Sequence, residues 1–451
     1  MKEVPREGSP AVPLGPASLG LGGFGQRLIR LGAARGGFLS KSGGVAISNT
    51  VARALSLGFS LITARVLGPT EYGVLAYGIA VSGVAAILIT NAPASLARFL
   101  PSARDEAERT VEFTSSQFVV WTAVSLTVLG TFVVLALGQR WSLVMVFAVL
   151  ANVAGLAVLY THRQTQRGLL RFLNIGYAYV GANLIQLVAT IIAVMVGWRS
   201  AIVMLFIYGL SPIPAVFITE FRQRTGIPFR RPAARRQRIQ ESARFVLPLT
   251  VHSAATSTWF AADVIMVEHF LRESATGTYN VAKTLGSVFI LIPGGLTTVL
   301  LPMVIGRRSK DSFAYLVQAS AAAAISGAGL LVIIALMGDR LVAVIFGGRY
   351  ANASQGLMGI SVGMALYGLT NVLQTYWVGR GRPRLSASSA VAGTVLSAML
   401  CYVLIPRYGL TGAGVGFAAG SVVQVIVLGS ATLRSMRGQS PEAGNPVVSV
   451  E

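Results

Sequence analysis

The chain has 451 residues, of which 53% are hydrophobic and only 12% are charged, and its mean hydropathy is +0.66. A soluble domain carries about 25% charged residues, so this composition excludes an ordinary soluble protein. The formal net charge of +21 does not indicate nucleic-acid binding, because the basic residues are distributed as membrane topology requires.

Apolar stretches of about 20 residues recur along the chain, each long enough to cross the ~30 Å hydrocarbon core of a bilayer. In lipid each stretch must be a helix, because a helix satisfies its backbone hydrogen bonds within one segment. The sequence therefore predicts an all-α integral membrane protein with twelve transmembrane helices. The predicted spans are residues 40–67, 72–91, 113–137, 141–160, 174–197, 201–221, 245–270, 279–305, 313–337, 356–378, 385–405 and 412–433.

The charge pattern predicts the orientation of these spans. If the N-terminus is cytoplasmic and the helices alternate, the N-terminal segment and the even-to-odd connections hold 28 of the 37 Lys and Arg. The opposite side holds seven, and two lie within spans, Arg53 and Lys283. This asymmetry follows the positive-inside rule, so both termini are predicted to be cytoplasmic. The basic side is also expected to contact anionic membrane lipids.

The spans divide into two six-helix lobes. Because each lobe begins on the inside, we expect a parallel repeat, related by a pseudo-twofold axis along the membrane normal, with a central cavity between the lobes. Residues 1–39 lack the apolar core of a cleavable signal. The predicted parts are a mostly disordered cytoplasmic segment at 1–39, an N-lobe at 40–221, a basic cytoplasmic linker at 222–244, a C-lobe at 245–434 and a disordered tail at 435–451.

The first span carries a polar stripe. Its members fall within an arc of about 60° on one helix face, because they are spaced four, three and four residues apart. An arginine in the bilayer centre costs about 2.5–3.5 kcal/mol on insertion scales, so it faces a wet cavity or a partner. Arg53 therefore either pairs with Asp263 or binds an anion in the central cavity, where a guanidinium suits a diphosphate. The stripe consists of Asn49, Arg53, Ser56 and Ser60.

A hairpin follows this stripe in the segment "TARVLGPTEYGVLAYG". Gly68 and Pro69 predict a tight outer turn, and Gly73 lies at the start of the second span. Arg65 and Glu71 are expected to cap the ends of the turn at the membrane interface. This corner would hold the first two helices together.

The seventh span repeats the polar spacing with His252, Thr256, Trp259 and Asp263. Asp263 is the one acidic residue well inside a predicted span, and it either carries a coupling proton or neutralises a cation, Lys283 or Arg53. Lys283 lies about one turn into the eighth span, so we expect its ammonium to reach outward to the interface. His252 is predicted to line a wall or the lipid edge, with a proton relay as the alternative.

The tenth span adds Tyr367, Asn371 and Gln374 as a third polar stripe. Together with Trp259 and the first stripe, Asn371 and Gln374 are candidate cavity residues. We find no metal-ligand spacing, no phosphate-cradling glycine loop and no nucleophile beside a base, so the sequence predicts neither a metal, nor a cofactor, nor an enzyme. Energy for transport would come from gradients or from the substrate.

The stretch "ARALSLGFSLITARVLGPTEYGVLAYG" resembles the first-helix signature of Wzx-type oligosaccharide flippases, a branch of the multidrug/oligosaccharidyl-lipid/polysaccharide exporter superfamily. A second similar piece places Tyr279 and Ala282 in "TYNVAK" after Asp263. Two features depart from the family pattern: the glycine near the second tyrosine is displaced in "TGTY", and Lys283 is an unexpected charge. The likeness extends over about residues 40–434 with the twelve-helix plan.

The resemblance implies translocation of a polyprenyl-diphosphate-linked oligosaccharide across the cytoplasmic membrane by alternating access, for surface polysaccharide synthesis. The chain would act as a monomer, with a polysaccharide polymerase and glycosyltransferases as partners and no nucleic acid. Two alternatives stay open within the superfamily: a flippase for the peptidoglycan lipid precursor, and a multidrug or cation exporter. A membrane polymerase or glycosyltransferase would need an acid/base pair or a large outer loop, and the sequence predicts neither.

Overall fold

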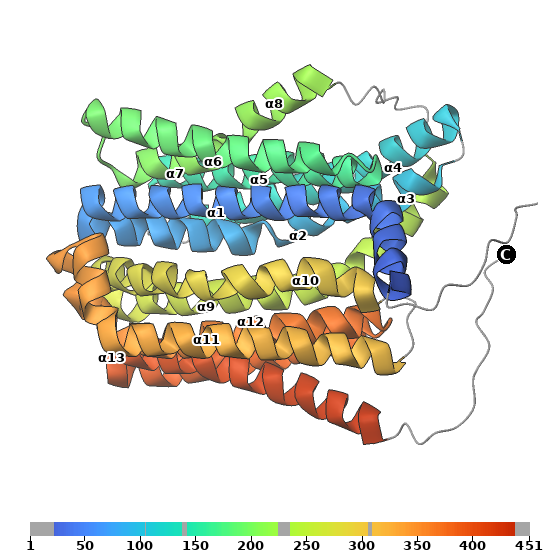
Figure 1. Cartoon of the computed structure of the whole chain (residues 1–451). Helices are drawn as coiled ribbons and strands as arrows, with labels where there is room; N and C mark the ends of the chain where they lie inside the picture. The colour runs from blue at the N-terminus through green and yellow to red at the C-terminus, as the bar shows by residue number, and fades with distance from the viewer. Residues whose placement is uncertain (1–21, 104, 138–141, 224–234, 305–308, 438–451) are drawn as a thin grey trace, which may run out of the picture.

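The computed structural model describes residues 22–103, 105–137, 142–223, 235–304 and 309–437. Over these residues every regular element is a helix (Figure 1). Part of the basic linker, part of the first segment and most of the tail lie outside the described residues. The elements are α1 (Gly22–Ala85), α2 (Ile87–Asn91), α3 (Ala94–Phe99), η1 (Leu100–Ser102), α4 (Glu106–Leu137), α5 (Leu143–Gly168), α6 (Phe172–Met195), α7 (Ala201–Leu210), α8 (Pro212–Gln223), α9 (Arg236–Gly286), η3 (Ser287–Ile290), α10 (Leu291–Val304), α11 (Ser309–Phe346), η4 (Gly348–Ala353), α12 (Ser354–Gly379) and α13 (Pro383–Arg437).

Nine helical runs within the described residues are long and apolar enough to cross a membrane. Three of them, in α1, α9 and α13, contain one residue with a positive φ: Gly68 at φ 74°, Arg272 at φ 71° and Gly409 at φ 57°. A positive φ interrupts a right-handed helix, and glycine adopts it without the Cβ clash that other residues meet. Figure 1 shows α1 doubling back on itself as two neighbouring rods.

The first turns of α1 start at Gly22, inside the segment predicted to be mostly disordered. In Figure 1 these turns (dark blue) run across the end of the bundle rather than along it. The last turns of α13 lie at the same end of the bundle. The structure thus places the start of α1 and the end of α13 on one side.

We call α1–α8 the N-lobe and α9–α13 the C-lobe, the upper and lower parts of the bundle in Figure 1. The lobes meet chiefly where α1 packs on α9. Two glycines allow this close approach: a Cβ on Gly73 would lie 1.8 Å from the Glu273 carbonyl oxygen, and one on Gly277 would lie 2.0 Å from that of Pro69. A single core cluster runs through both lobes, with Phe59 and Leu205 on one side and Trp259 and Phe417 on the other.

The outside of the bundle is strongly apolar. Large hydrophobic side chains are exposed on most helices, among them Trp121 (60%), Phe217 (70%), Leu336 (77%) and Met195 (81%). A soluble monomer rarely exposes contiguous apolar surface on this scale, whereas lipid tails solvate it without cost. The fold is therefore that of an all-α membrane protein.

Candidate functional site

The polar stripe of α1 lies beside the C-lobe. Asn49, Ser56 and Ser60 are half-buried, whereas Arg53 is exposed. The guanidinium of Arg53 is close enough to the Tyr367 hydroxyl of α12 to interact with it electrostatically. Arg53 makes no ion pair with any residue that the structure describes. The stripe therefore presents an unmatched positive charge toward the opposite lobe.

Asp263 pairs with Lys283 inside the C-lobe. The Lys283 Nζ atom donates to both carboxylate oxygens, at 2.6 and 2.8 Å, and also to the Phe260 carbonyl. The Tyr279 hydroxyl donates to the same carboxylate at 2.8 Å. The expectation that Lys283 reaches outward is wrong: its side chain is 11% exposed and that of Asp263 is 0% exposed. Lys283 binds the nearby buried carboxylate instead of extending to the membrane interface, so the two charges neutralise each other.

Trp259 occupies an aromatic cluster behind this pair. Its ring stacks on Phe417 with centroids 4.3 Å apart, and lies 5.0 Å from Tyr367 and 4.8 Å from Phe260. Lys283 Nζ lies 5.2 Å from the centroid of the Phe417 ring. Since Trp259 is 1% exposed, it supports the surface carrying Tyr367 from within. The cluster fixes α9, α12 and α13 together.

The other candidate residues of the C-lobe differ in how deeply they are buried and in their hydrogen bonds. Asn371 is half-buried on α12, one turn from Tyr367. Gln374 is buried and donates to Gln424 of α13 at 3.4 Å, so its amide belongs to the packing of the C-lobe. His252 is half-buried, and its Nδ1 atom has no hydrogen-bond partner among the described residues.

The hairpin at Gly68 and Pro69 joins the two lobes. Arg65 does not cap its own turn; it donates to the carbonyls of Ile345 (2.7 Å) and Val344 (2.5 Å), at the end of α11. Glu71 accepts from the Ala201 amide at 2.7 Å and so caps α7 instead. Both charges are used on neighbouring helix ends, whose free carbonyls and amides are natural partners for them.

Two further hydrogen bonds close the same end of the lobe interface. The Tyr350 hydroxyl donates to the Ala64 carbonyl at 2.6 Å, and the Asn280 amide donates to the Tyr72 hydroxyl at 3.0 Å. We call these two bonds, with the two from Arg65, the hairpin seal. Arg53 precedes the break at Gly68 by 15 residues, about 22 Å along the helix. The unmatched cation therefore lies well away from the sealed end.

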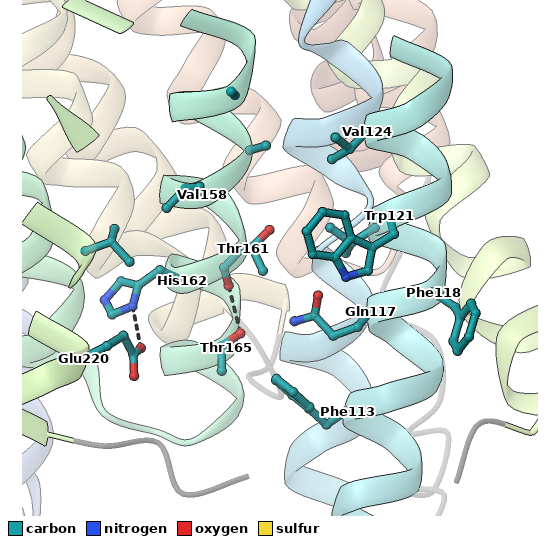
Figure 2. Close-up of a pocket in the computed structure, with 14 residues that line it drawn as sticks. Phe113, Gln117, Phe118, Trp121, Val124, Val158, Thr161, His162, Thr165 and Glu220 are labelled. Carbon is teal, nitrogen blue, oxygen red and sulfur yellow. Dashed lines mark hydrogen bonds and ion pairs between the residues drawn. The ribbon is translucent and has the colours of Figure 1, made fainter. Parts of the chain in front are cut away.

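A cavity of about 1240 Å³ in the N-lobe was not predicted from the sequence. It opens within the N-lobe between α4, α5 and α8, and we call it the side groove (Figure 2). His162 and Glu220 meet at its wall, with 2.7 Å between Nδ1 and Oε1, and Gln166 also donates to Glu220 at 2.9 Å. These residues come from different helices without a shared periodicity, so no sequence pattern predicts their contact. Among its lining residues are Phe113, Gln117, Trp121, Thr161, His162 and Glu220.

No group of three His, Cys, Asp or Glu side chains within the described ranges is arranged to hold a metal ion. Among the described residues, the features that could bind a ligand are the exposed guanidinium of Arg53 at the lobe interface and the apolar side groove, while Asp263 and Lys283 neutralise each other.

Comparison with solved structures finds the same fold in two membrane proteins of known structure. The fold matches the inward-facing conformation of a multidrug resistance MATE family transporter of the MOP superfamily, with a TM-score of 0.70 and 15% identity over 88% of this chain and 99% of that one. It also matches the lipid II flippase MurJ in an inward closed conformation, with a TM-score of 0.71 and 13% identity over 86% of this chain and 87% of that one. At these identities the likeness concerns the fold.

Sequence comparison is more specific. The probable low-salt glycan biosynthesis flippase Agl15 of Haloferax volcanii is 25% identical over 170 residues, which span 37% of this chain and 36% of that relative. The family model described as polysaccharide biosynthesis protein matches residues 38–306, more than half of the chain. The chain therefore belongs to the polysaccharide biosynthesis protein family and is a multi-pass membrane protein.

Proposed function

We propose that the protein moves a polyprenyl-diphosphate-linked oligosaccharide from the cytoplasmic to the outer leaflet of the cytoplasmic membrane by alternating access. The observation that carries this proposal is the unmatched charge of Arg53, which lies in the first span and faces Tyr367 of the opposite lobe. A guanidinium in a bilayer needs an anion, and a diphosphate matches its planar donors bidentately.

The rest of the candidate path consists of neutral hydrogen-bonding groups. Asn49, Ser56 and Ser60 flank Arg53 on α1, and Asn371 extends the polar surface on α12. Amides and hydroxyls of this kind suit the sugar headgroup, while the polyprenyl chain remains in lipid. Trp259 and Gln374 would act from behind this surface, through the packing of the C-lobe.

The topology in this proposal has twelve helices. Nine apolar runs become twelve spans if the breaks at Gly68, Arg272 and Gly409 each divide a run in two. Each lobe would then hold six helices, related by a pseudo-twofold axis. The positive-inside distribution supports cytoplasmic termini in this proposal, and so does the shared end of α1 and α13 in Figure 1.

The membrane potential favours the proposed direction. Moving one negative charge outward from a negative interior releases about 2.3 kcal/mol per 100 mV. In this scheme Asp263 need not carry a proton, because Lys283 and Tyr279 already satisfy its carboxylate. The same pair leaves Asp263 without a free charge for an organic cation, because Lys283 already neutralises its carboxylate.

Purified protein in liposomes tests the proposal with a fluorescent polyprenyl-diphosphate oligosaccharide whose outer-leaflet fraction is measured. We expect Arg53→Ala to reduce flipping by at least about tenfold, Arg53→Lys to reduce it less, and Arg199→Ala, at another exposed arginine, to have no effect. In cells, Arg53→Ala would abolish surface polysaccharide while the protein stays in the membrane. Unchanged flipping by well-folded Arg53→Ala would remove Arg53 from the mechanism.

A peptidoglycan lipid precursor also carries a diphosphate, so the same assay includes it as a second substrate. Faster flipping of that precursor than of the oligosaccharide would assign the protein to the alternative pathway. Transport of a lipophilic cation, with neither diphosphate lipid moved, would support the multidrug alternative and refute the role of Arg53.

A further inference from the structure

The side groove of the N-lobe is separate from the proposed transport path and has no role in it. Its walls are mainly apolar, and Trp121, at its edge, is 60% exposed on the lipid-facing side of α4. Its volume of about 1240 Å³ exceeds the ~300–1,000 Å³ of pockets that hold drug-sized ligands. The groove therefore has room for a long hydrocarbon chain that enters from the bilayer.

A buried polar group in the groove lacks a partner. Gln117 is 8% exposed, and its carboxamide makes no hydrogen bond with any residue that the structure describes. Figure 2 shows this carboxamide pointing from α4 toward α5, where Thr161 points back toward it. An amide supplies two donors and one acceptor, and in Gln117 they are open to the groove for a ligand to use. The groove thus offers this amide to an oxygen-bearing ligand from outside the chain.

The charged part of the lining comes from α8. Glu220 has a side chain that is 30% exposed, and it lies three residues before the end of α8 at Gln223. Its carboxylate is held in place by His162 and Gln166. A negative group at this position attracts an ammonium and repels a ligand whose only charge is a phosphate.

We propose that the side groove binds one glycerolipid of the surrounding bilayer that carries a primary-amine headgroup. One acyl chain lies along the apolar walls, an ester carbonyl accepts from the Gln117 amide, and the ammonium lies beside Glu220. The chemistry favours a glycerolipid over the polyprenyl chain of a transport substrate, because a polyprenyl chain has no oxygen to offer Gln117. The proposal does not depend on which substrate the protein moves.

Native mass spectrometry of the purified full chain tests this site. The protein is exposed to equimolar phosphatidylethanolamine and phosphatidylglycerol with the same acyl chains, and the retained lipid is counted. We expect one phosphatidylethanolamine per chain. Ala154→Phe, which fills the groove from α5, should abolish its retention, and Gln117→Leu should weaken it by about 2- to 10-fold. Leu126→Phe, at an exposed position of α4 outside the lining, is the matched control.

Glu220→Gln tests the headgroup, since it keeps the size of the side chain and removes its charge. We expect the preference for phosphatidylethanolamine over phosphatidylglycerol to fall to parity. Equal retention of both lipids by the unmodified protein, or full retention by folded Ala154→Phe, would overturn the proposal. A third arm adds a polyprenyl phosphate: its displacement of the bound lipid from the unmodified protein and from Leu126→Phe alike would assign the groove to the substrate chain and overturn the proposal. If Ala154→Phe does not fold, Gln117→Leu decides the outcome.

Discussion

Among single substitutions of Asp263 or Lys283, replacing Lys283 by methionine should lower the free energy of unfolding the most. Met keeps the length of the side chain but removes the ammonium that both oxygens of Asp263 accept from. The carboxylate would keep only the Tyr279 hydroxyl and the Val264 amide as donors, and its charge would remain in a site where it is 0% exposed. Removing one partner of a buried ion pair costs about 3–5 kcal/mol.

The reverse change should cost less. Asp263→Asn leaves an ammonium that still donates to the Phe260 carbonyl and is already 11% exposed. A flexible lysine can move its charge toward water, which a short aspartate cannot do. The double variant Asp263→Asn with Lys283→Met removes both charges, so its stability should return to within about 1–2 kcal/mol of the original protein.

Unfolding in detergent, followed by thermal and denaturant titration, measures this order of stability. The same four proteins are then compared for transport at several pH values. If Asp263 only neutralises Lys283, the double variant should transport with an unchanged pH dependence. A Lys283→Met protein as stable as the original would refute the buried pair, and a folded double variant that has lost its pH dependence would show that Asp263 carries a proton.

The hairpin seal and the helix breaks can be tested in the same way. Arg65→Ala removes two hydrogen bonds between the lobes, and Gly277→Ala places a Cβ 2.0 Å from a carbonyl oxygen. Each change should therefore favour a state open at the hairpin end by about tenfold. Distances between spin labels placed across that end would become longer. Unchanged distances would show that the seal does not hold the lobes together. Gly68→Ala should destabilise the fold by about 1–3 kcal/mol and Arg272→Gly should stabilise it, since both positions have a backbone that suits glycine alone. A lower unfolding temperature for Arg272→Gly would contradict this assignment of strain.

Features that depend on local pattern could be predicted from the sequence. The break at Gly68 coincides with the Gly-Pro turn expected there, and Arg53 shares a helix face with Asn49 as the 3.6-residue period requires. Apolar stretches of sufficient length became helices because lipid leaves the backbone no alternative. Such signals lie within one segment, so a single sequence contains them.

Features that depend on which helices meet could not be predicted. Periodicity gives the face on which Lys283 lies but not that α9 turns back at Arg272, which brings the ammonium to Asp263. The two lobes also correspond at a different residue offset from the one that Tyr72 and Tyr279 suggest. Gly68 and Arg272 are 204 residues apart, as are Gly73 and Gly277, whereas Tyr72 and Tyr279 are 207 apart. The contact of Gly73 and Gly277 with the opposite turn therefore shows which residues of the two turns correspond, whereas the match between Tyr72 and Tyr279 does not.

The treatment of charge within this one molecule supports the proposed mechanism. Lys283 shows what the fold does with a cation that serves structure: it is 11% exposed, and a carboxylate and a carbonyl satisfy it. Arg53 lies in the same membrane-spanning core, yet it is exposed and has no counter-charge among the described residues. Because an unmatched guanidinium in a bilayer is unfavourable, it stays bound to water or waits for an anion supplied by the substrate. A site without a counter-charge that faces the opposite lobe has the charge that the proposed binding of a diphosphate requires, whereas a neutralised site such as that of Lys283 has no charge left to offer.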